Sequence, residues 1–209
     1  MSLLQSIIVF AISYALLLIA MTVHEFAHGA VAYKLGDSTA RMSGRLTLNP
    51  LAHIDPFWTL ILPLVLFLST GGRFVFGAAK PVPINYWSLK NPKRDIIWIG
   101  LAGPLANFLL AFIISLAFKF VSQEGVAGYL LVNLLTINVV LAVFNLIPLP
   151  PLDGSKVLMG LLPQALAEKY GQLERYGFVI LFIFIWLGMF EKLVWPLVVA
   201  VMKILGAGF

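Results

Sequence analysis

The sequence predicts an all-α polytopic membrane protein, a bundle of about four to six transmembrane helices with short β-strand or re-entrant elements between the first and second clear spans. Two observations carry this prediction. Of the 209 residues, 61% are apolar and only 11% are charged, whereas soluble domains carry about 25% charged residues. The mean hydropathy is +0.98. So few charges cannot cover a water-soluble enzyme, and the composition also excludes disordered, collagen-like and nucleic-acid-binding architectures.

Four runs are long and apolar enough to be spans, because a membrane helix needs about 20 apolar residues. The first run is uncharged and covers residues 2–23, and the next two cover residues 96–118 and 125–147. The fourth, residues 178–205, is either one long helix or a helical hairpin, because Pro196 favours a break. We expect residues 1–209 to form a single membrane domain.

The region between the first two spans is predicted to be irregular. Ser38–Pro50 and Gly72–Asn85 are rich in Gly, Pro, Thr and β-branched residues, which is typical of short strands and turns. Between them, residues 57–70 are apolar but contain Pro63. A run this short favours a re-entrant or interfacial segment, with a short span as the alternative.

The first span runs directly into the sequence HEFAH, residues 24–28. On a helix, His24 and His28 lie on one face and can bind one metal ion together, while Glu25 can act on a water molecule beside that ion. The chain has no cysteine, and zinc suits a site made of imidazole and carboxylate. Two structural histidines are the alternative, but ionisable groups at the end of an apolar helix indicate function.

A catalytic zinc usually has three protein ligands and one open position. Asp153 is the candidate third ligand, because it follows the proline-rich end of the third span, NLIPLPPLDG, residues 145–154. Alternatively, Asp153 caps a helix that begins near Ser155. The incomplete HExxH site favours ligation, so we expect one Zn2+ per chain, bound by His24, His28 and Asp153.

Together these motifs resemble the site-2 protease family (M50) of intramembrane zinc metalloproteases. That family pairs HExxH near the end of one span with NxxPxPxLDG near the end of a later one. Gly103–Asn107 also resembles its GxxxN element, and Asn49–Pro56 looks like the minimal bacterial and archaeal branch without a PDZ domain. The resemblance extends from Met21 to at least Gly154.

The resemblance implies roles for individual residues. Glu25 would be the general base beside the zinc, and Asn145 would hold substrate or the oxyanion. The other candidate substrate-binding residues are Asn107 and His53. Asn107 could instead bond a neighbouring helix, and His53, beside Asp55, could assist proton transfer or a second metal but more commonly satisfies backbone groups.

The predicted function is that of an intramembrane zinc endopeptidase, which hydrolyses peptide bonds in or near transmembrane segments of other membrane proteins. Substrate must be extended there, and residues 45–48 and 74–83 could pair with it by β-augmentation or could merely seal the cavity. A catalytically idle, membrane-protein-binding relative and a metal transporter are the alternatives. The complete HExxH and Asp153 set argues against the first, and the lack of repeated halves argues against the second.

The net charge of +5 is interpreted as a signal of orientation, and no nucleic-acid partner is expected. Residues 24–95 and 153–175 carry eleven of the 14 Lys and Arg residues. If residues 57–70 do not span, both stretches lie on the same side. The positive-inside rule then places the active site toward the cytoplasmic side of a multi-pass cell-membrane protein. The lipid bilayer and transmembrane protein substrates are the expected partners.

Overall fold

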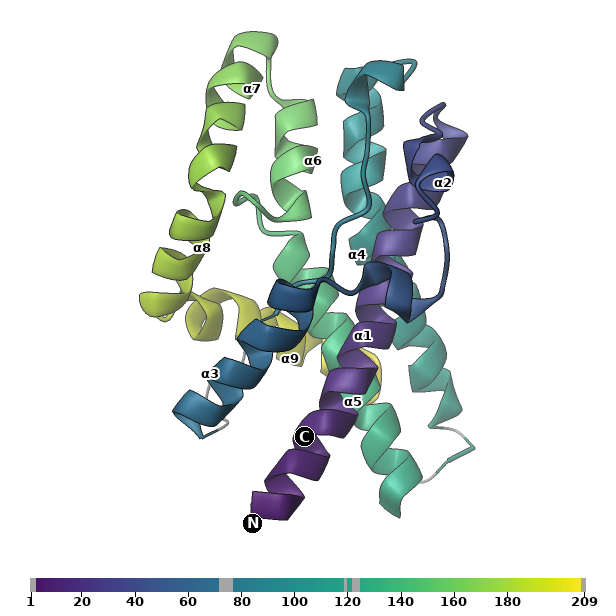
Figure 1. The fold of residues 1–209 in the computed structure, drawn as a ribbon, viewed down its shortest axis with the longest axis vertical. Coiled ribbons are helices and arrows are strands. Elements are labelled where there is room, and N and C mark those ends of the chain that lie inside the picture. The colour runs from purple at the N-terminus through teal and green to yellow at the C-terminus, as the bar shows by residue number, and fades with distance from the viewer. Residues whose placement is uncertain (1–2, 72–76, 119, 122–124, 208–209) are drawn as a thin grey trace.

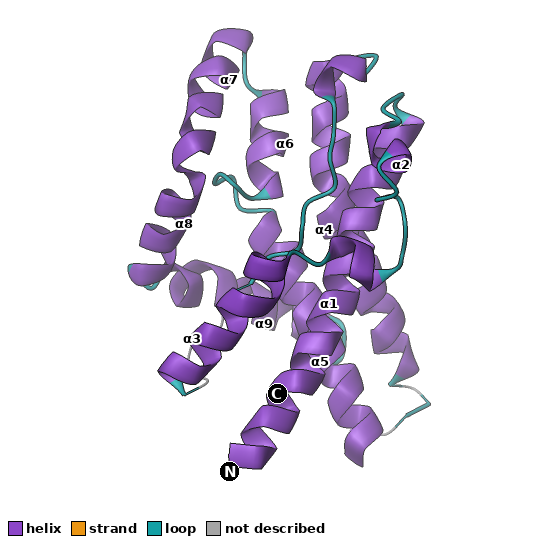
Figure 2. Cartoon of the chain, in the orientation of Figure 1, coloured by secondary structure: helices purple, strands orange, loops and turns teal. Residues whose placement is uncertain are grey.

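A computed structural model describes residues 3–71, 77–118, 120–121 and 125–207, and these residues fold into a bundle of helices (Figure 1). Within these residues there is no β-strand (Figure 2). The all-helical class is therefore confirmed, but the described residues contain three candidate spans, or four if a bent pair of helices counts as one, so the predicted four to six spans are met only at the lower limit.

Three helices are long and apolar enough to cross a membrane: α1 Leu3–Lys34, α4 Pro92–Ala117 and α5 Gly125–Asn145. They correspond to the first three predicted spans. Helix α1 continues eleven residues beyond the predicted end at residue 23. The apolar run ends at residue 23 because ionisable residues begin at His24. An ionisable residue does not end a helix, and no proline follows nearby, so HEFAH is part of the same helix.

The fourth predicted span is a bent pair of helices. Helix α7 (Gln164–Gly171) leads through a 3-10 turn (Gln172–Tyr176) into α8 (Gly177–Trp186), and a π-helical turn (Phe190–Val194) leads into α9 (Trp195–Ile204). The two halves are bent by 73°. The break lies at Gly188, which has a φ of +67°, a conformation that favours glycine. Pro196 instead occupies the first turn of α9, where its missing N–H costs nothing.

The predicted strands were wrong. Ser38–Pro50 contains the one-turn helix α2 (Thr39–Met42) and leads into a 3-10 turn, Pro50–His53. In the second stretch, residues 72–76 lie outside the described residues, and residues 77–85 belong to no helix or strand. The physical reason is that this backbone bonds to helices and loops: the amide of Lys80, for example, donates to the carbonyl of His53 at 2.9 Å.

The apolar segment that was left open between re-entrant and spanning is one short helix, a π-helical turn (Pro56–Ile61) continued by α3 (Leu62–Thr70). Side-chain bonds join His28 to Ile99 and Asn107 to Ala20, so α1 and α4 are antiparallel neighbours. The connection between these two helices therefore begins and ends at the same end of the pair. The connection as a whole therefore makes no net crossing, which agrees with the re-entrant alternative for Pro56–Thr70.

The apolar core lies where α4, α5 and α9 meet. Its fully buried side chains come from all three helices: Ala111, Leu135, Val139, Val198 and Met202. Helix α6 (Asp153–Leu161) follows α5 after a proline-rich turn and packs along α4. This packing brings the start of α6 beside His24 and His28 in the C-terminal third of α1.

Candidate metal centre

The two histidines of HEFAH lie one turn apart on α1, and both are buried. Asp153 is the first residue of α6 and is also buried. Its side chain does not cap that helix, because Leu152 holds the N-cap position and no side-chain capping bond is present. The structure thus brings the three predicted ligands together, and the capping alternative for Asp153 has no support.

Three ligand atoms converge between α1 and α6. Nε2 of His24 lies 2.9 Å from Oδ2 of Asp153, Nε2 of His28 lies 3.1 Å from the same oxygen, and the two Nε2 atoms lie 3.0 Å apart. Among the described residues, His24, His28 and Asp153 form a group whose ligand atoms lie close enough together to hold one metal ion.

The tautomer of a neutral His28 follows from the contact of its Nδ1 atom, which faces away from the cluster. Nδ1 of His28 lies 2.6 Å from the carbonyl oxygen of Ile99. A carbonyl only accepts hydrogen bonds, so Nδ1 must carry the proton. In a neutral imidazole, Nε2 then presents a lone pair toward Asp153.

His24 is oriented by the same kind of contact. Its Nδ1 lies 2.5 Å from Oδ1 of Asn107. The amide nitrogen of Asn107 donates to the carbonyl of Ala20 at 3.2 Å and to Oδ1 of Asn138 at 2.7 Å. Because both of those partners accept, the amide oxygen must be the atom that faces His24, and in the neutral imidazole Nε2 of His24 is left as an acceptor.

Metal binding requires both imidazoles to be neutral, and in that state three acceptor atoms face one another without a proton between them. Such an arrangement is repulsive unless a cation lies among the lone pairs, so the residues fit a metal ion. For tetrahedral zinc with bonds of about 2.0–2.1 Å, ligand atoms would be roughly 3.3–3.4 Å apart. Small outward movements of the side chains would reach that spacing. Two imidazoles, one carboxylate and an open position match a catalytic zinc site.

The backbone of α4 leaves room for this cluster only because residue 103 is glycine. A Cβ atom at Gly103 would lie 2.5 Å from Nε2 of His24 and would also collide with Nε2 of His28. Gly103 is therefore a residue of close approach between α4 and the ligand side chains.

Lys156 was not anticipated from the sequence. Its Nζ lies 3.3 Å from Oδ1 of Asp153, the carboxylate oxygen that does not face the histidines. The signal was available, since residues i and i+3 share a helix face. This contact holds the carboxylate so that Oδ2 points toward the two imidazoles.

A cavity of about 430 Å3 opens beside the cluster. It is lined by His24, Glu25 and Asp153, together with Asn145 and Lys156. Glu25 accepts a hydrogen bond at Oε2 from the amide of Val82 at 2.7 Å. Asn145 donates from Nδ2 to the carbonyl of Leu141 at 3.0 Å, one turn earlier on α5. The predicted base and the predicted oxyanion donor thus line the same cavity as the ligands.

One wall of this cavity is the extended segment 77–82, of which Gly77, Ala78, Ala79 and Pro81 line the space. The segment is anchored by alternate residues. Ala78 bonds to Trp58, Lys80 to His53, and Val82 to Glu25. The chain therefore lies extended beside the candidate site even though it belongs to no sheet.

The two other predicted substrate residues lie outside the cavity lining. Asn107 is fully buried, and both ends of its amide are bonded as described above. His53 is buried as well, with Nε2 2.9 Å from the carbonyl of Thr47. This contact matches the interpretation that His53 satisfies backbone groups.

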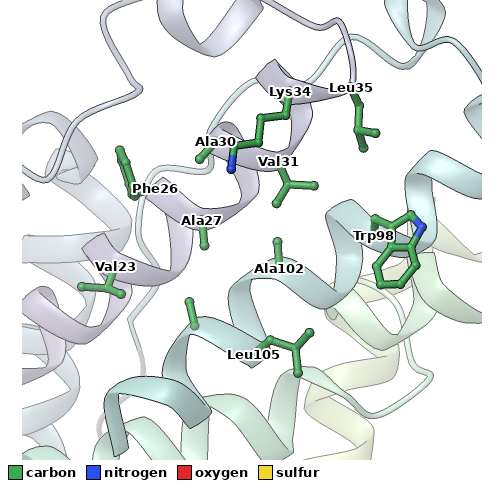
Figure 3. A pocket seen from close by; sticks show the side chains of 11 residues that line it. Val23, Phe26, Ala27, Ala30, Val31, Lys34, Leu35, Trp98, Ala102 and Leu105 are labelled. Atoms are coloured by element: carbon green, nitrogen blue, oxygen red, sulfur yellow. The ribbon is translucent and has the colours of Figure 1, made fainter. Parts of the chain in front are cut away.

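A larger cavity, about 600 Å3, has no part in this site (Figure 3). It lies between α1 and α4 and shares no lining residue with the cavity around Glu25. Its walls are apolar, with Phe26, Ala30, Trp98 and Leu105 among them, and Lys34 at one end. The helical spacing places these α1 residues away from the face that carries His24 and His28.

Fold and site together define a class: a polytopic membrane protein with a buried HExxH–Asp cluster of the metallopeptidase type. The model of peptidase family M50 matches residues 12–127 and 114–188. The chain belongs to peptidase family M50, a family of zinc metalloproteases.

Relatives support this assignment over most of the chain. YwhC of Bacillus subtilis is 36% identical over 87% of this chain and 83% of its own length. Rip2 of Mycobacterium tuberculosis is 33% identical over 72% of this chain and 57% of its own length. Zinc metalloprotease MJ0392 of Methanocaldococcus jannaschii is 28% identical over 83% of this chain and 40% of its own length. No solved structure gives a significant match to the chain.

Proposed function

We propose that this chain is an intramembrane zinc endopeptidase that cleaves peptide bonds in or near transmembrane segments of other membrane proteins. The observation that carries the proposal is the convergence of three potential ligand atoms, from His24, His28 and Asp153, at a cavity that Glu25 also lines, among helices long enough to span a membrane. Family membership supports the peptidase class. His24, His28 and Asp153 would hold one zinc ion.

When bound, zinc would lower the pKa of a water molecule and polarise the scissile carbonyl. The chain's own residues supply the rest of the chemistry. Oε1 of Glu25 takes a proton from the attacking water, since Oε2 is held by the amide of Val82. The protonated carboxyl then gives this proton to the leaving nitrogen. The remaining amide hydrogen of Asn145 donates to the developing oxyanion.

The extended segment 77–82 is the part of the chain suited to hold substrate. The amides of the alternate residues Ala78, Lys80 and Val82 are bonded to the protein, and Ala79 and Pro81, on the opposite edge, line the cavity together with Gly77 and Ala78. An unwound stretch of a transmembrane substrate would lie along this edge and present its backbone to Glu25. Unwinding is required because a helical peptide bond is shielded by its own helix.

The decisive experiment separates metal binding from catalysis. Purified protein would be incubated with a panel of single-span membrane substrates, and zinc content would be measured in parallel. Glu25→Gln preserves the shape but removes the base, so we expect full zinc content and at least about a 10²-fold loss of cleavage. His24→Ala and Asp153→Ala should lose both zinc and cleavage.

Glu168→Gln serves as the matched control, because Glu168 is exposed on α7, outside the cavity lining, and its carboxylate accepts a hydrogen bond from Gln164, an exposed residue of the same helix. It should leave cleavage unchanged. Near wild-type turnover in Glu25→Gln would refute the proposed base. Zinc binding without cleavage of any substrate would favour an idle, partner-binding relative, and zinc movement across vesicles would favour a transporter.

A further inference from the structure

We propose that Asn107 and Asn138 form a buried relay that fixes the tautomer and orientation of His24 for metal binding. The inference rests on the metal centre of the proposed function, but it concerns residues on α4 and α5 that touch neither metal nor substrate. Asn107 and Asn138 are positioning residues, and the relay runs from α5 through α4 to α1.

Asn138 is the fixed end of this relay. It is fully buried on α5, and its Nδ2 donates to the carbonyl of Leu134 at 2.8 Å. Since that carbonyl can only accept, the amide of Asn138 cannot turn over, and its Oδ1 is directed at α4. There it accepts the hydrogen bond from Nδ2 of Asn107 at 2.7 Å.

Asn107 transmits that orientation to the histidine. With its nitrogen held by Asn138 and by the carbonyl of Ala20, its oxygen is presented to Nδ1 of His24 at 2.5 Å. Nδ1 must then carry the proton, and Nε2 keeps its lone pair for the metal. If Asn107 could turn over, its NH2 would face Nδ1 and favour the opposite tautomer, with a proton on Nε2.

His28 needs no such relay, because a backbone carbonyl cannot turn over. Its Nδ1 is paired with Ile99, on the helix that packs against α1. His24 lies one turn earlier, where α4 presents a side chain to it. The side-chain amides of Asn107 and Asn138 therefore fix the tautomer of His24, as the backbone carbonyl of Ile99 fixes that of His28.

The test compares two substitutions of nearly equal shape at residue 138. Asn138→Val removes the acceptor for Asn107, whereas Asn138→Thr keeps a hydroxyl that can donate to Leu134 and accept from Asn107. Thr136 on the same helix already donates to the carbonyl four residues earlier, at 2.8 Å. Partners of metal-binding histidines are typically worth about 10–100-fold in metal affinity. We expect Asn138→Val to weaken zinc binding to that extent, with Asn138→Thr in between.

Asn133→Val is the matched control. Asn133 also lies on α5 and donates to the carbonyl of the residue four positions earlier, but it is outside the relay. Zinc affinity would be measured by competition with a chelator in purified protein of verified helical content. The visible spectrum of the Co2+-substituted protein would report the ligand geometry, which a general loss of stability would not alter in the folded fraction.

A mutant cycle completes the test. If Asn138 acts through Asn107, then Asn138→Val should cost little in a protein that already carries Asn107→Leu. The relay is overturned if the two losses simply add, if Asn138→Val binds zinc as tightly as Asn133→Val, or if Asn138→Thr and Asn138→Val lose affinity equally. Failure of the proposed function is a different result, namely that wild-type protein binds no zinc or that His24→Ala still binds it.

Discussion

Gly103 offers the sharpest test at the scale of single residues, because one methyl group there would occupy the space of the ligand nitrogens. We expect Gly103→Ala to lose zinc and cleavage together while the helices remain, since α4 tolerates alanine better than glycine. Zinc analysis and circular dichroism of the purified variant would check this.

Gly171→Ala is its control, because a Cβ atom there would lie 3.5 Å from Sδ of Met159, an ordinary contact. That variant should keep its zinc. Full zinc occupancy in Gly103→Ala would mean that α4 does not approach the histidines as closely as the structure places it.

Asn145 should separate rate from binding. It lines the cavity with Glu25, its amide donates to the carbonyl of Leu141, and it is not one of the three clustered ligands. Asn145→Ala is expected to retain zinc and to lower turnover by about 10²–10³-fold, the usual effect of one oxyanion donor. The comparison is with Asn133→Ala, which removes an equivalent bond within α5 and should leave turnover unchanged. Loss of zinc in Asn145→Ala would assign Asn145 to the metal centre instead.

The sequence contained enough to place His24, His28, Glu25 and Asp153 in one site, because HExxH fixes a helix face and a proline-framed aspartate is rare in an apolar run. The hydrogen-bond partners of these residues could not be predicted from the sequence. Asn107 was predicted either to bind substrate or to bond a neighbouring helix, and the structure bonds it to His24 on α1 and to Asn138 on α5. Which side of α4 faces α1 depends on helix packing, and no local pattern in the sequence determines it.

At the scale of elements, Asp37 joins two segments that precede the second span. Its Oδ1 accepts from the amide and the hydroxyl of Thr39, and its Oδ2 accepts from the amide of Asn85 at 2.7 Å. Burial alone would raise the pKa of Asp37. The hydrogen bonds from Thr39 and Asn85 outweigh this effect, so the pKa lies below its usual value of 3.8. The ionised carboxylate thus stabilises the contact between α2 and the segment before α4.

Asp37→Asn should destabilise the protein by about 1–3 kcal/mol at neutral pH, because the new NH2 would face the amide of Asn85. A carboxyl with a lowered pKa stabilises the fold above its usual pKa, and this effect is lost as the pH falls through the folded-state pKa. The difference in thermal stability between wild type and Asp37→Asn should therefore be constant near neutrality and shrink below about pH 4.

Asp55→Asn is the control for this pH dependence. Both backbone donors to Asp55, from Phe57 and Trp58, meet the same oxygen, which an asparagine also provides. That substitution should have a much smaller effect. An equal loss of stability in the two variants, or a difference for Asp37→Asn that persists at low pH, would contradict the assigned role of Asp37.

Helices were predicted more reliably than their ends and the connections between them. Runs of apolar residues identify α4 and α5, whereas α1 runs past its predicted end because charge does not stop a helix. The strands expected in Ser38–Pro50 and around Pro83 do not form in the described residues. Their β-branched and turn residues suit an extended backbone, but a strand also needs a neighbouring edge, and such pairing is not encoded locally.

For the whole molecule, the antiparallel pairing of α1 with α4 predicts a topology that labelling can test. The chain has no native cysteine, so single cysteines at Ser43, Ser88, Phe120 and Val126 would react without background. If the active site faces the cytoplasm, an impermeant thiol reagent on intact cells should label Phe120→Cys and Val126→Cys and spare Ser43→Cys and Ser88→Cys.

Permeabilised cells provide the positive control, in which all four exposed positions should react. A reversed pattern would place the site on the outer side. Labelling of Ser43→Cys with protection of Ser88→Cys would mean that the chain crosses the membrane between these two residues. Asp153 on α6 would then lie on the opposite side from the histidines of α1, and the cluster could not form.

The bare backbone at Gly103 also sets a condition for anyone who would transplant this centre into a designed helical bundle. Copying two histidines and one aspartate onto suitable positions would not suffice, because an ordinary third helix would push its side chains into the space reserved for the ion. The design must specify an empty position as deliberately as the occupied ones. In such a bundle, the spacing between helices must be designed together with the ligands of the metal site.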